Sequence, residues 1–231
     1  IVNSGVMSAG IGNVNLASAV TQNLMVTNIA GTIQALNGSI NVRDAAFAGI
    51  ANLDIVGGNV LAKEINLNAG AGSLHANLSE VVGTLNTSGS YAHISAATDN
   101  LTLGAVGING DPTFFNSAGD ITISGNIEVE EKLAIIASKN IITTAGVNLI
   151  QARDAAGQGY DIHLIAGANV SGTGSTTGIS ATPPITGSAT GDVTMTGASS
   201  TGGNIDLSAS TTIYINANST CADCSAGNVT L

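Results

Sequence analysis

Aromatic side chains are scarce in this chain of 231 residues. They make up 3% of the sequence and Trp is absent, whereas hydrophobic residues as a whole reach 44%. A compact globular core of this length normally uses large rings to fill its centre. The apolar residues here are mainly Val, Ile, Leu and Ala, which favours a narrow interior built of thin, repeated layers. Pro is equally rare, at three residues, so little interrupts backbone pairing.

Cations are the second shortage. The net charge of −10 results from 15 acidic residues and only five basic ones: Arg43, Lys63, Lys132, Lys139 and Arg153. Five scattered cations make no phosphate-neutralising patch, so the composition argues against nucleic acid as a partner. The same shortage argues against docking on anionic membranes. An acidic surface that is otherwise rich in Ser, Thr and Asn is typical of proteins that stay soluble outside the cell.

Long apolar runs are also missing. No stretch of about 18 apolar residues occurs, so the sequence predicts no membrane insertion as a helix. Charged residues amount to 9% and the mean hydropathy is positive, which excludes an intrinsically disordered chain. The sequence begins at Ile1 without an initiator Met, and we expect an exported protein without its leader, taken from a longer polypeptide.

The cysteines number only two, Cys221 and Cys224, in a single CxxC. A catalytic thiol pair usually opens a helix in an α/β unit, and no helical pattern surrounds this one. A zinc site would need two more ligands, and the three histidines are not grouped near it. We therefore predict a local disulfide in an oxidising compartment, with metal binding or redox chemistry as the alternative. No cofactor is expected.

A short pattern recurs along the whole chain: Gly, then Asn, Asp or Ser, then alternating apolar and polar residues. Its copies are GNVNL at 12–16, GSINV at 38–42, GSLHA at 72–76, GDITI at 119–123, GNIEV at 125–129, GDVTM at 191–195, GNIDL at 203–207 and GNVTL at 227–231. Alternation with a period of two predicts short strands with one buried face, and the leading pair is typical of a turn.

The spacing of these copies indicates how the strands pack. It clusters near 20–27 residues, which suits one coil of a solenoid, whereas hairpins would show two-residue Asn-Gly or Asp-Gly links. We predict an all-β fold, a right-handed parallel β-helix in one elongated domain covering residues 1–231. A β-sandwich is the rival. Residues from about 167 to 203 are rich in Gly, Ser and Thr and predict a long loop, or a hinge between two solenoid segments.

Three stretches carry a resemblance to a known family. GDITISGNI at 119–127, LAIIASKNIIT at 133–143 and YDIHLIAGA at 160–168 look like the coils of filamentous haemagglutinin-like proteins. The likeness is best from about residue 119 to 217. It implies a secreted bacterial surface protein with a β-helical fold, used for adhesion, aggregation or matrix. The Asn-Pro motifs of that family's secretion domain are absent, and the family has no fixed binding motif to carry over.

An enzyme on this scaffold would cleave acidic polysaccharides with clustered carboxylates and a cation. The densest acidic group is Glu128, Glu130 and Glu131, followed by Lys132. Glu128 and Glu130 alternate along one expected strand and would share an outward face. A solvated strand edge explains them better, so we predict no enzyme activity. Neither Gly-Gly-x-Gly-x-Asp repeats nor EF-hand spacing occurs. His75, His93 and His163 are expected to be isolated surface side chains or satisfied side chains rather than ligands.

Three hypotheses follow for function. The first is an adhesive or structural module on the cell surface, whose partner is a glycan or protein of a host or neighbouring cell. The second is a subunit that binds other copies of itself end to end, because unpaired strands at the ends of a solenoid can pair with another chain. Its expected assembly ends are Ile1 and Val2 at the start, and Val229 and Leu231 at the finish. The third, a polysaccharide-active enzyme, is the least favoured.

Overall fold

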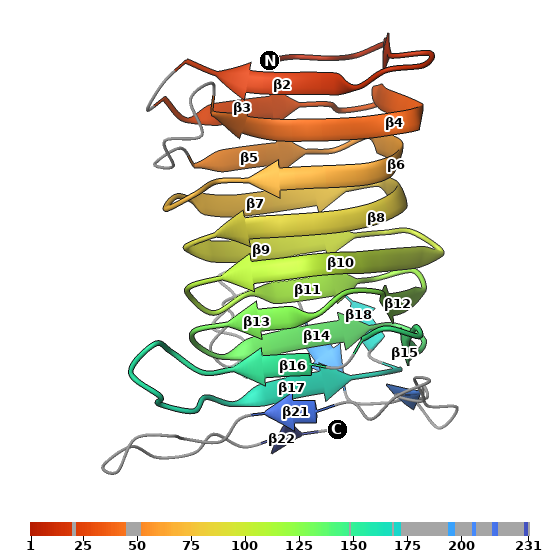
Figure 1. Ribbon diagram of the computed structural model, residues 1–231. Coiled ribbons are helices and arrows are strands. Elements are labelled where there is room, and N and C mark those ends of the chain that lie inside the picture. The colour runs from red at the N-terminus through yellow and green to blue at the C-terminus, as the bar shows by residue number, and fades with distance from the viewer. Residues whose placement is uncertain are drawn as a thin grey trace.

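The chain folds into a right-handed parallel β-solenoid, whose coils stack along one axis in the computed structural model (Figure 1). The structure describes residues 1–19, 22–44, 52–147 and 149–167, and the backbone of strand residues 169–171, 194–196, 205–206, 214–216 and 229–230. Within these residues the secondary structure consists of strands and contains no α-helix. The predicted all-β, parallel β-helical fold is therefore confirmed.

The larger of the two main sheets has twelve strands, all paired in parallel. Its strands are β1 (Val6–Ser8), β2 (Val14–Ser18), β4 (Thr32–Asp44), β6 (Asn59–Asn68), β8 (Glu80–Gly89), β10 (Asn100–Ile108), β12 (Asp120–Ile123), β13 (Ile127–Val129), β15 (Ile141–Thr143), β16 (Leu149–Ala152), β20 (Ile205–Asp206) and β21 (Tyr214–Asn216).

The second sheet has eight parallel strands, contributed by successive coils. They are β3 (Leu24–Thr27), β5 (Leu53–Val56), β7 (Ser73–Leu78), β9 (Tyr91–Ala96), β11 (Thr113–Asn116), β14 (Leu133–Ala137), β17 (Ile162–Ile165) and β22 (Val229–Thr230). Along the chain, each strand of the eight-stranded sheet follows one strand or two successive strands of the larger sheet (Figure 1).

The predicted loop at 167–203 is described only in part. Two short strands within it, β18 (Asn169–Ser171) and β19 (Thr194–Thr196), pair antiparallel and belong to neither main sheet. The solenoid resumes after this segment, because β22 pairs in parallel with β17 at Val229 and Ile162. Those two partners are 67 residues apart in the sequence, whereas Leu133 and Ile162 in the preceding pair are 29 apart. The segment is thus inserted between two adjacent coils.

The twelve-stranded sheet bends at a corner and so forms two faces of the solenoid. The long strands β4, β6, β8 and β10 cross this corner. The pairings β4–β6, β6–β8 and β8–β10 each show a register shift at that point. Gly83 marks the corner in β8 with a φ of 120°, and a Cβ there would overlap the backbone carbonyl of Ala62 in the coil before. Only glycine fits such a close approach of backbones. In β4 the register shift spans Gly38, the first residue of the GSINV motif, so this Gly-led motif also lies at the corner.

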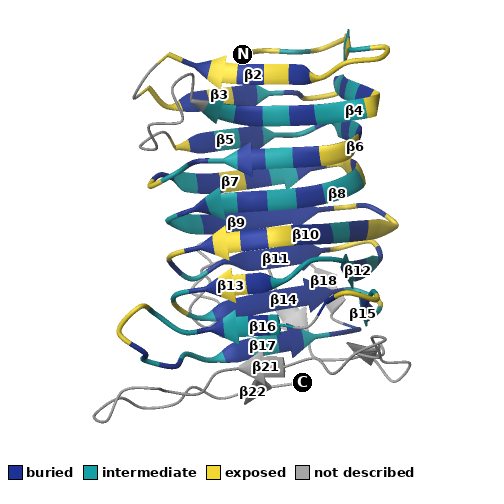
Figure 2. Cartoon of the chain, in the orientation of Figure 1, coloured by how far each residue is buried: buried dark blue, intermediate teal, exposed yellow. Residues whose placement is uncertain are grey.

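Aliphatic side chains fill the interior in columns that run from coil to coil. One column consists of Val26, Ile55, Ala76, Ile94, Phe114, Ile135 and Leu164, which are partners in successive strand pairs. All of them are buried and belong to one continuous core. Buried and more exposed positions alternate along most strands (Figure 2). This is the narrow, layered interior that the scarcity of aromatic residues predicted.

An asparagine ladder runs along the outer side of the larger sheet. Asn41, Asn66 and Asn86 each donate from Nδ2 to the Oδ1 of the asparagine in the coil before, starting at Asn15, over 2.8–2.9 Å. The ladder ends where the backbone N–H of Ala105 donates to Asn86 Oδ1 over 2.9 Å. A Cβ on the neighbouring Gly104 would overlap that oxygen. A slip in register would break all these bonds, so the ladder specifies the register of the coils.

We expect Asn66→Ala to lower the free energy of unfolding by about 1–2 kcal/mol, because it removes two amide–amide bonds at a half-buried position. Urea unfolding followed by circular dichroism measures the change. Ser88→Ala, in the neighbouring coil on the same side of the sheet, is the matched control and should change stability by less than about 0.5 kcal/mol. Equal effects of the two substitutions would contradict a stabilising role for the ladder.

Candidate binding site on the eight-stranded sheet

The outer side of the eight-stranded sheet carries a column of polar side chains on successive coils. Asp54 of β5 lies opposite His75 of β7, and His75 lies opposite His93 of β9. The column continues through Thr113 of β11 to Ala134 and then His163. Adjacent parallel strands are about 4.8 Å apart, so in-register side chains on one side of the sheet are direct neighbours. Asp54, His75 and His93, which are far apart in the sequence, therefore lie side by side in one row.

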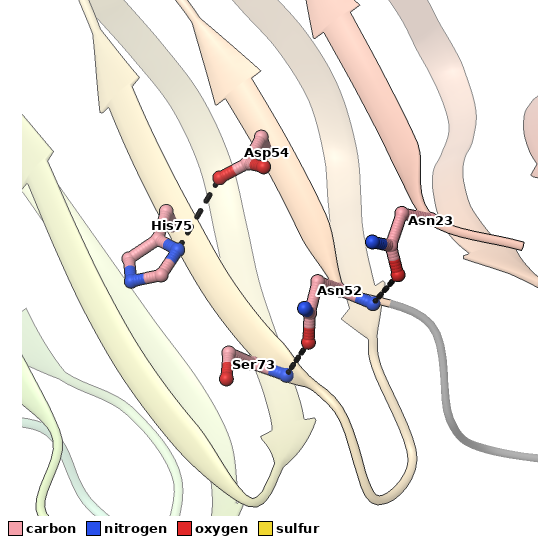
Figure 3. A network of polar contacts seen from close by, with 5 residues as sticks. All are labelled: Asn23, Asn52, Asp54, Ser73 and His75. Carbon is pink, nitrogen blue, oxygen red and sulfur yellow. Dashed lines mark hydrogen bonds and ion pairs between the residues drawn. The ribbon is translucent and has the colours of Figure 1, made fainter.

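The beginning of this column is held in register by a second set of polar contacts, shown in Figure 3. The backbone N–H of Asn52 donates to Asn23 Oδ1 and that of Ser73 donates to Asn52 Oδ1, each over 3.0 Å. Asn52 and Ser73 stand two residues before Asp54 and His75, so these bonds align the strand starts. The side chains of Asp54 and His75 consequently meet on the same side of the sheet.

His75 Nδ1 lies 3.2 Å from Asp54 Oδ1, a polar contact that is an ion pair when the imidazole is protonated. Both side chains are about half exposed. The imidazole also contacts the ring of Tyr91, at the start of β9, with 5.7 Å between ring centroids and a tilt of 57°. Two directional contacts therefore fix the orientation of His75. His75 is therefore a surface side chain that is satisfied by its neighbours, one of the two forms expected for the histidines, and His93 lies opposite it on the next coil.

Exposure changes along this side of the sheet. Met25 and His75 are exposed, but His93, Thr113 and Ala134 are buried. Phe115 and Ile136 also lie on the outer side, opposite the core residues Phe114 and Ile135, and are almost fully buried without belonging to the main core. Figure 2 shows β11 and β14 as buried along their length. The outer side of the sheet is thus open at β5 and β7 and covered at β11 and β14.

A small pocket lies where the open part meets the covered part. It has a volume of about 180 Å³ and is lined mostly by apolar surface of β5, β7 and β9. Its lining consists of Asp54, Ile55, Val56, His75, Ala76, Asn77 and His93. A mostly apolar hollow with a few converging polar groups is the usual form of a small-ligand site. This pocket is the candidate binding site.

A second pocket is lined by two of the three acidic residues that the sequence singled out, Glu128 and Glu130 but not Glu131. Its volume is about 340 Å³, and Glu128, Glu130, Arg153 and Asp154 line it together with Gln151. β13 ends at Val129, so Glu130 follows the strand and does not continue it, contrary to the expected alternation. The two glutamates nevertheless border the same pocket. The sequence did not predict that Arg153 and Asp154 would join them.

Asp154 has a structural role in this second pocket. The backbone N–H of Gln158 donates to its Oδ1 over 2.9 Å, and Tyr160 Oη donates to its Oδ2 over 3.1 Å. These hydrogen bonds lower the pKa of Asp154, the bond from Gln158 most of all. A general acid at neutral pH needs the opposite change, a raised pKa. Asp154 therefore anchors the turn at 153–160.

The pKa of Tyr160 is raised, first by desolvation and then by its hydrogen bond to Asp154 and the charges of Asp154 and Glu131. We expect Asp154→Asn to lower this pKa, because the phenolate no longer faces the carboxylate, but to leave it above the usual value, since desolvation remains. Absorbance and NMR titrations of the tyrosines measure it. The matched variant Asp111→Asn should lower the pKa of Tyr91 instead, which Asp111 raises after desolvation. A Tyr160 pKa unchanged by Asp154→Asn would contradict the contact.

A wider groove lies at the outer edge of β8 and β10. It has a volume of about 680 Å³ and a mainly polar lining that includes Glu80, Asp99 and Val82. Its open shape buries little apolar surface of a ligand, so we do not regard it as the primary site. In the part of the chain that the structure describes, no three His, Cys, Asp or Glu side chains are grouped to hold a metal ion. Nor does any helix there have the length and apolar character to cross a membrane.

The remaining predicted site residues lie at the ends of the chain. Ile1 and Val2 run beside β3, where the amino group of Ile1 donates to the carbonyl of Met25 and Val2 bridges to Thr27. Val229 begins β22 and extends the eight-stranded sheet. Cys221, Cys224 and Leu231 lie outside the described residues.

The comparisons with known proteins found no match: no family model fits the chain, and no curated protein or solved structure is significantly similar to it. The fold and the candidate site therefore carry the functional argument by themselves.

Proposed function

We propose that this chain is a non-catalytic binding module of a secreted bacterial surface protein, a stiff rod that mediates adhesion or builds cell-surface or matrix structure. Its partner is a glycan or protein on a host or neighbouring cell. The observation that carries the proposal is the open outer side of β5 and β7, where Asp54 and His75 are held in a fixed, half-exposed geometry beside a pocket. The resemblance of residues 119–217 to filamentous haemagglutinin-like coils supports a surface role.

The scaffold suits such a role. Coil-to-coil backbone bonds and the asparagine ladder hold the register along the axis, so side chains on the outer side keep fixed spacings. A site on rigid strands binds without the cost of ordering a loop. The acidic, Ser-, Thr- and Asn-rich composition keeps the rod soluble and limits unspecific attraction to anionic surfaces.

Attachment of microspheres coated with the purified chain tests this proposal. We expect coated spheres to bind target cells and soluble chain to compete with them. The double variant Asp54→Asn/His75→Gln should lose most of the binding, whereas Glu80→Gln, an exposed carboxylate outside the pocket, should retain it. Deleting the segment from its parent protein should reduce attachment of the cell that displays it. Unchanged attachment after that deletion would contradict the adhesive role.

A second candidate function, end-to-end assembly into an extracellular fibre, is favoured by the first coils. Seven of the eight large apolar side chains that are exposed among the described residues lie within residues 1–36: Ile1, Val2, Val6, Ile11, Met25, Ile29 and Leu36. Among the described strands, β1 and β2 pair with β4 alone. A strand edge of this kind can add a parallel strand, from another copy or from residues that precede Ile1 in a longer polypeptide.

Sedimentation velocity over a range of concentrations tests the assembly hypothesis. We expect the chain to form larger species as its concentration rises, and Ile11→Lys to shift the distribution to monomer, because a charged side chain at an edge opposes strand addition. Val82→Lys, an exposed apolar position away from that edge, is the control and should leave assembly unchanged. A chain that stays monomeric at its highest soluble concentration would rule out the fibre.

A further inference from the structure

We infer that the pocket formed by Asp54, His75, Asn77 and His93 binds a single uncharged sugar residue, which makes it the recognition site of the adhesive role proposed above. The inference rests on that proposed function for its biological setting. The class of ligand is inferred from the geometry of three adjacent strands, β5, β7 and β9.

The hydrogen-bonding groups at the pocket are arranged as acceptors next to a donor. His75 Nδ1 lies against Asp54 Oδ1, which leaves Asp54 Oδ2 as an acceptor and His75 Nε2 as a second hydrogen-bonding atom. Asn77 accepts a bond from Ser95 Oγ on its Oδ1 over 3.3 Å, which leaves its Nδ2 as a donor toward the ligand. Neighbouring hydroxyl groups of a sugar can donate to Asp54, bond to His75 Nε2 and accept from the amide.

The rest of the lining is apolar. Val56 and the faces of the imidazole rings offer surface to the C–H groups of a sugar ring, and the pocket of about 180 Å³ is small enough to restrict the ligand to one residue. His93 closes the pocket from the next coil, where its side chain is buried. A ligand with both a hydroxylated edge and an apolar face therefore uses every part of the site.

The charge of the pocket and of the chain restricts the class of ligand further. Asp54 is the only acidic group that lines the pocket, and the chain carries a net charge of −10, so an anionic ligand such as a sugar acid is repelled. A cationic ligand would pair with Asp54 but would leave the apolar lining and the Asn77 donor unused. A neutral hexose or N-acetylhexosamine fits best. Single-residue recognition in such a shallow site gives dissociation constants on the order of millimolar.

The histidines provide the measurement, because the chain has only three and two of them line the pocket. We would follow the imidazole C2–H resonances by NMR while adding methyl glycosides of galactose, glucose and N-acetylglucosamine to about 50 mM, above the expected dissociation constants. The resonances of His75 and His93 should shift with saturation. His163 lies on the same column but outside the pocket and should not shift.

The variant Asp54→Asn should weaken the interaction about tenfold, as expected for loss of a charged acceptor, while Glu80→Gln should leave it unchanged. His75→Gln is the second variant, and circular dichroism confirms that each variant is folded. Methyl glucuronoside and acetyl-lysinamide serve as the anionic and cationic probes. Binding of only the lysine probe, equal shifts of all three histidines, or no shift with any neutral glycoside would overturn the inference.

The outcome separates this inference from the proposed function. If cell attachment persists but no glycoside shifts the resonances of His75 or His93, the sugar site is ruled out and the adhesive role is retained. If these resonances shift but the coated spheres do not attach to cells, the sugar site is retained and the adhesive role is ruled out.

Discussion

Replacing Phe114 with alanine is expected to lower the free energy of unfolding by about 3–5 kcal/mol. Phe114 is fully buried and is the only aromatic member of the main core cluster among the described residues, since the buried Phe115 lies on the outer side of the sheet. It lies between Ile94 and Ile135 in the column behind the eight-stranded sheet. The surrounding coils are held by backbone bonds on all sides, so they cannot collapse into the vacated space and a cavity remains.

Urea unfolding followed by circular dichroism measures this effect. Val82→Ala, which truncates a half-exposed apolar side chain, is the control and should change the stability by less than about 0.5 kcal/mol. A repeat-like stack can unfold in more than one step, so the transition of the coils around Phe114 should be followed separately, by hydrogen exchange. A loss below 1 kcal/mol for Phe114→Ala would contradict the packing of the core.

The second large effect is expected at Asn116, a fully buried polar side chain at the turn between β11 and β12. Its Nδ2 donates to the carbonyls of Thr98 and Asp120 over 2.9 and 2.7 Å, and its Oδ1 accepts from the N–H of Thr98 over 3.2 Å. The N–H of Ala118 also donates to Oδ1 over 3.4 Å, so Asn116→Ala leaves four backbone groups without these partners. We expect a loss on the order of 3 kcal/mol, since each buried unpaired group costs about 1–3 kcal/mol.

The same unfolding measurement applies, with Asn100→Ala as the control. Asn100 exchanges hydrogen bonds with Thr102 and Thr122, but at an exposed position where water replaces them. Its substitution should therefore cost less than about 1 kcal/mol. If Asn116→Ala were no more destabilising than Asn100→Ala, the amide would not be the bridge between coils that the structure shows.

The architecture was predictable because alternation and turn residues are local signals. Val14 and Leu16, for example, are inward residues of β2, as the GNVNL motif predicts. The long strand β4 was not predicted, since a single strand continues through the corner at Gly38, where its pairing with β6 shifts in register. The corner looks like a turn in the sequence but acts as a bend within one strand.

The burial of the outer side of the eight-stranded sheet at β11 and β14 could also have been predicted from the sequence. The five residues of β14, Leu133–Ala137, are all buried, and they form a continuous apolar run rather than an alternating one. Such runs are typical of strands buried on both sides. The adjacent Phe114 and Phe115 show the same feature, with one ring pointing to each side of the sheet.

The candidate site could not be predicted, because its residues meet only through the lengths of the coils. From Asp54 to His75 the register advances 21 residues, and from His75 to His93 it advances 18. Corners and bulges set these lengths, and they differ from coil to coil. The sequence alone therefore showed three separate polar residues, whereas the second pocket was partly predictable, since Glu128 and Glu130 are neighbours in the chain.

The most direct test of the account is a disulfide cross-link at the site itself. Asp54→Cys and His75→Cys would be introduced together, in a background where Cys221 and Cys224 are serine. Opposed residues of adjacent parallel strands are about 4.8 Å apart, within the range that a disulfide spans. We predict rapid formation of the bond on mild oxidation, seen by mass spectrometry. The control pair Asp54→Cys/Asn77→Cys, two residues out of register, should link slowly or not at all. Equal rates for the two pairs, or no bond for the first, would contradict the coil register on which the site depends.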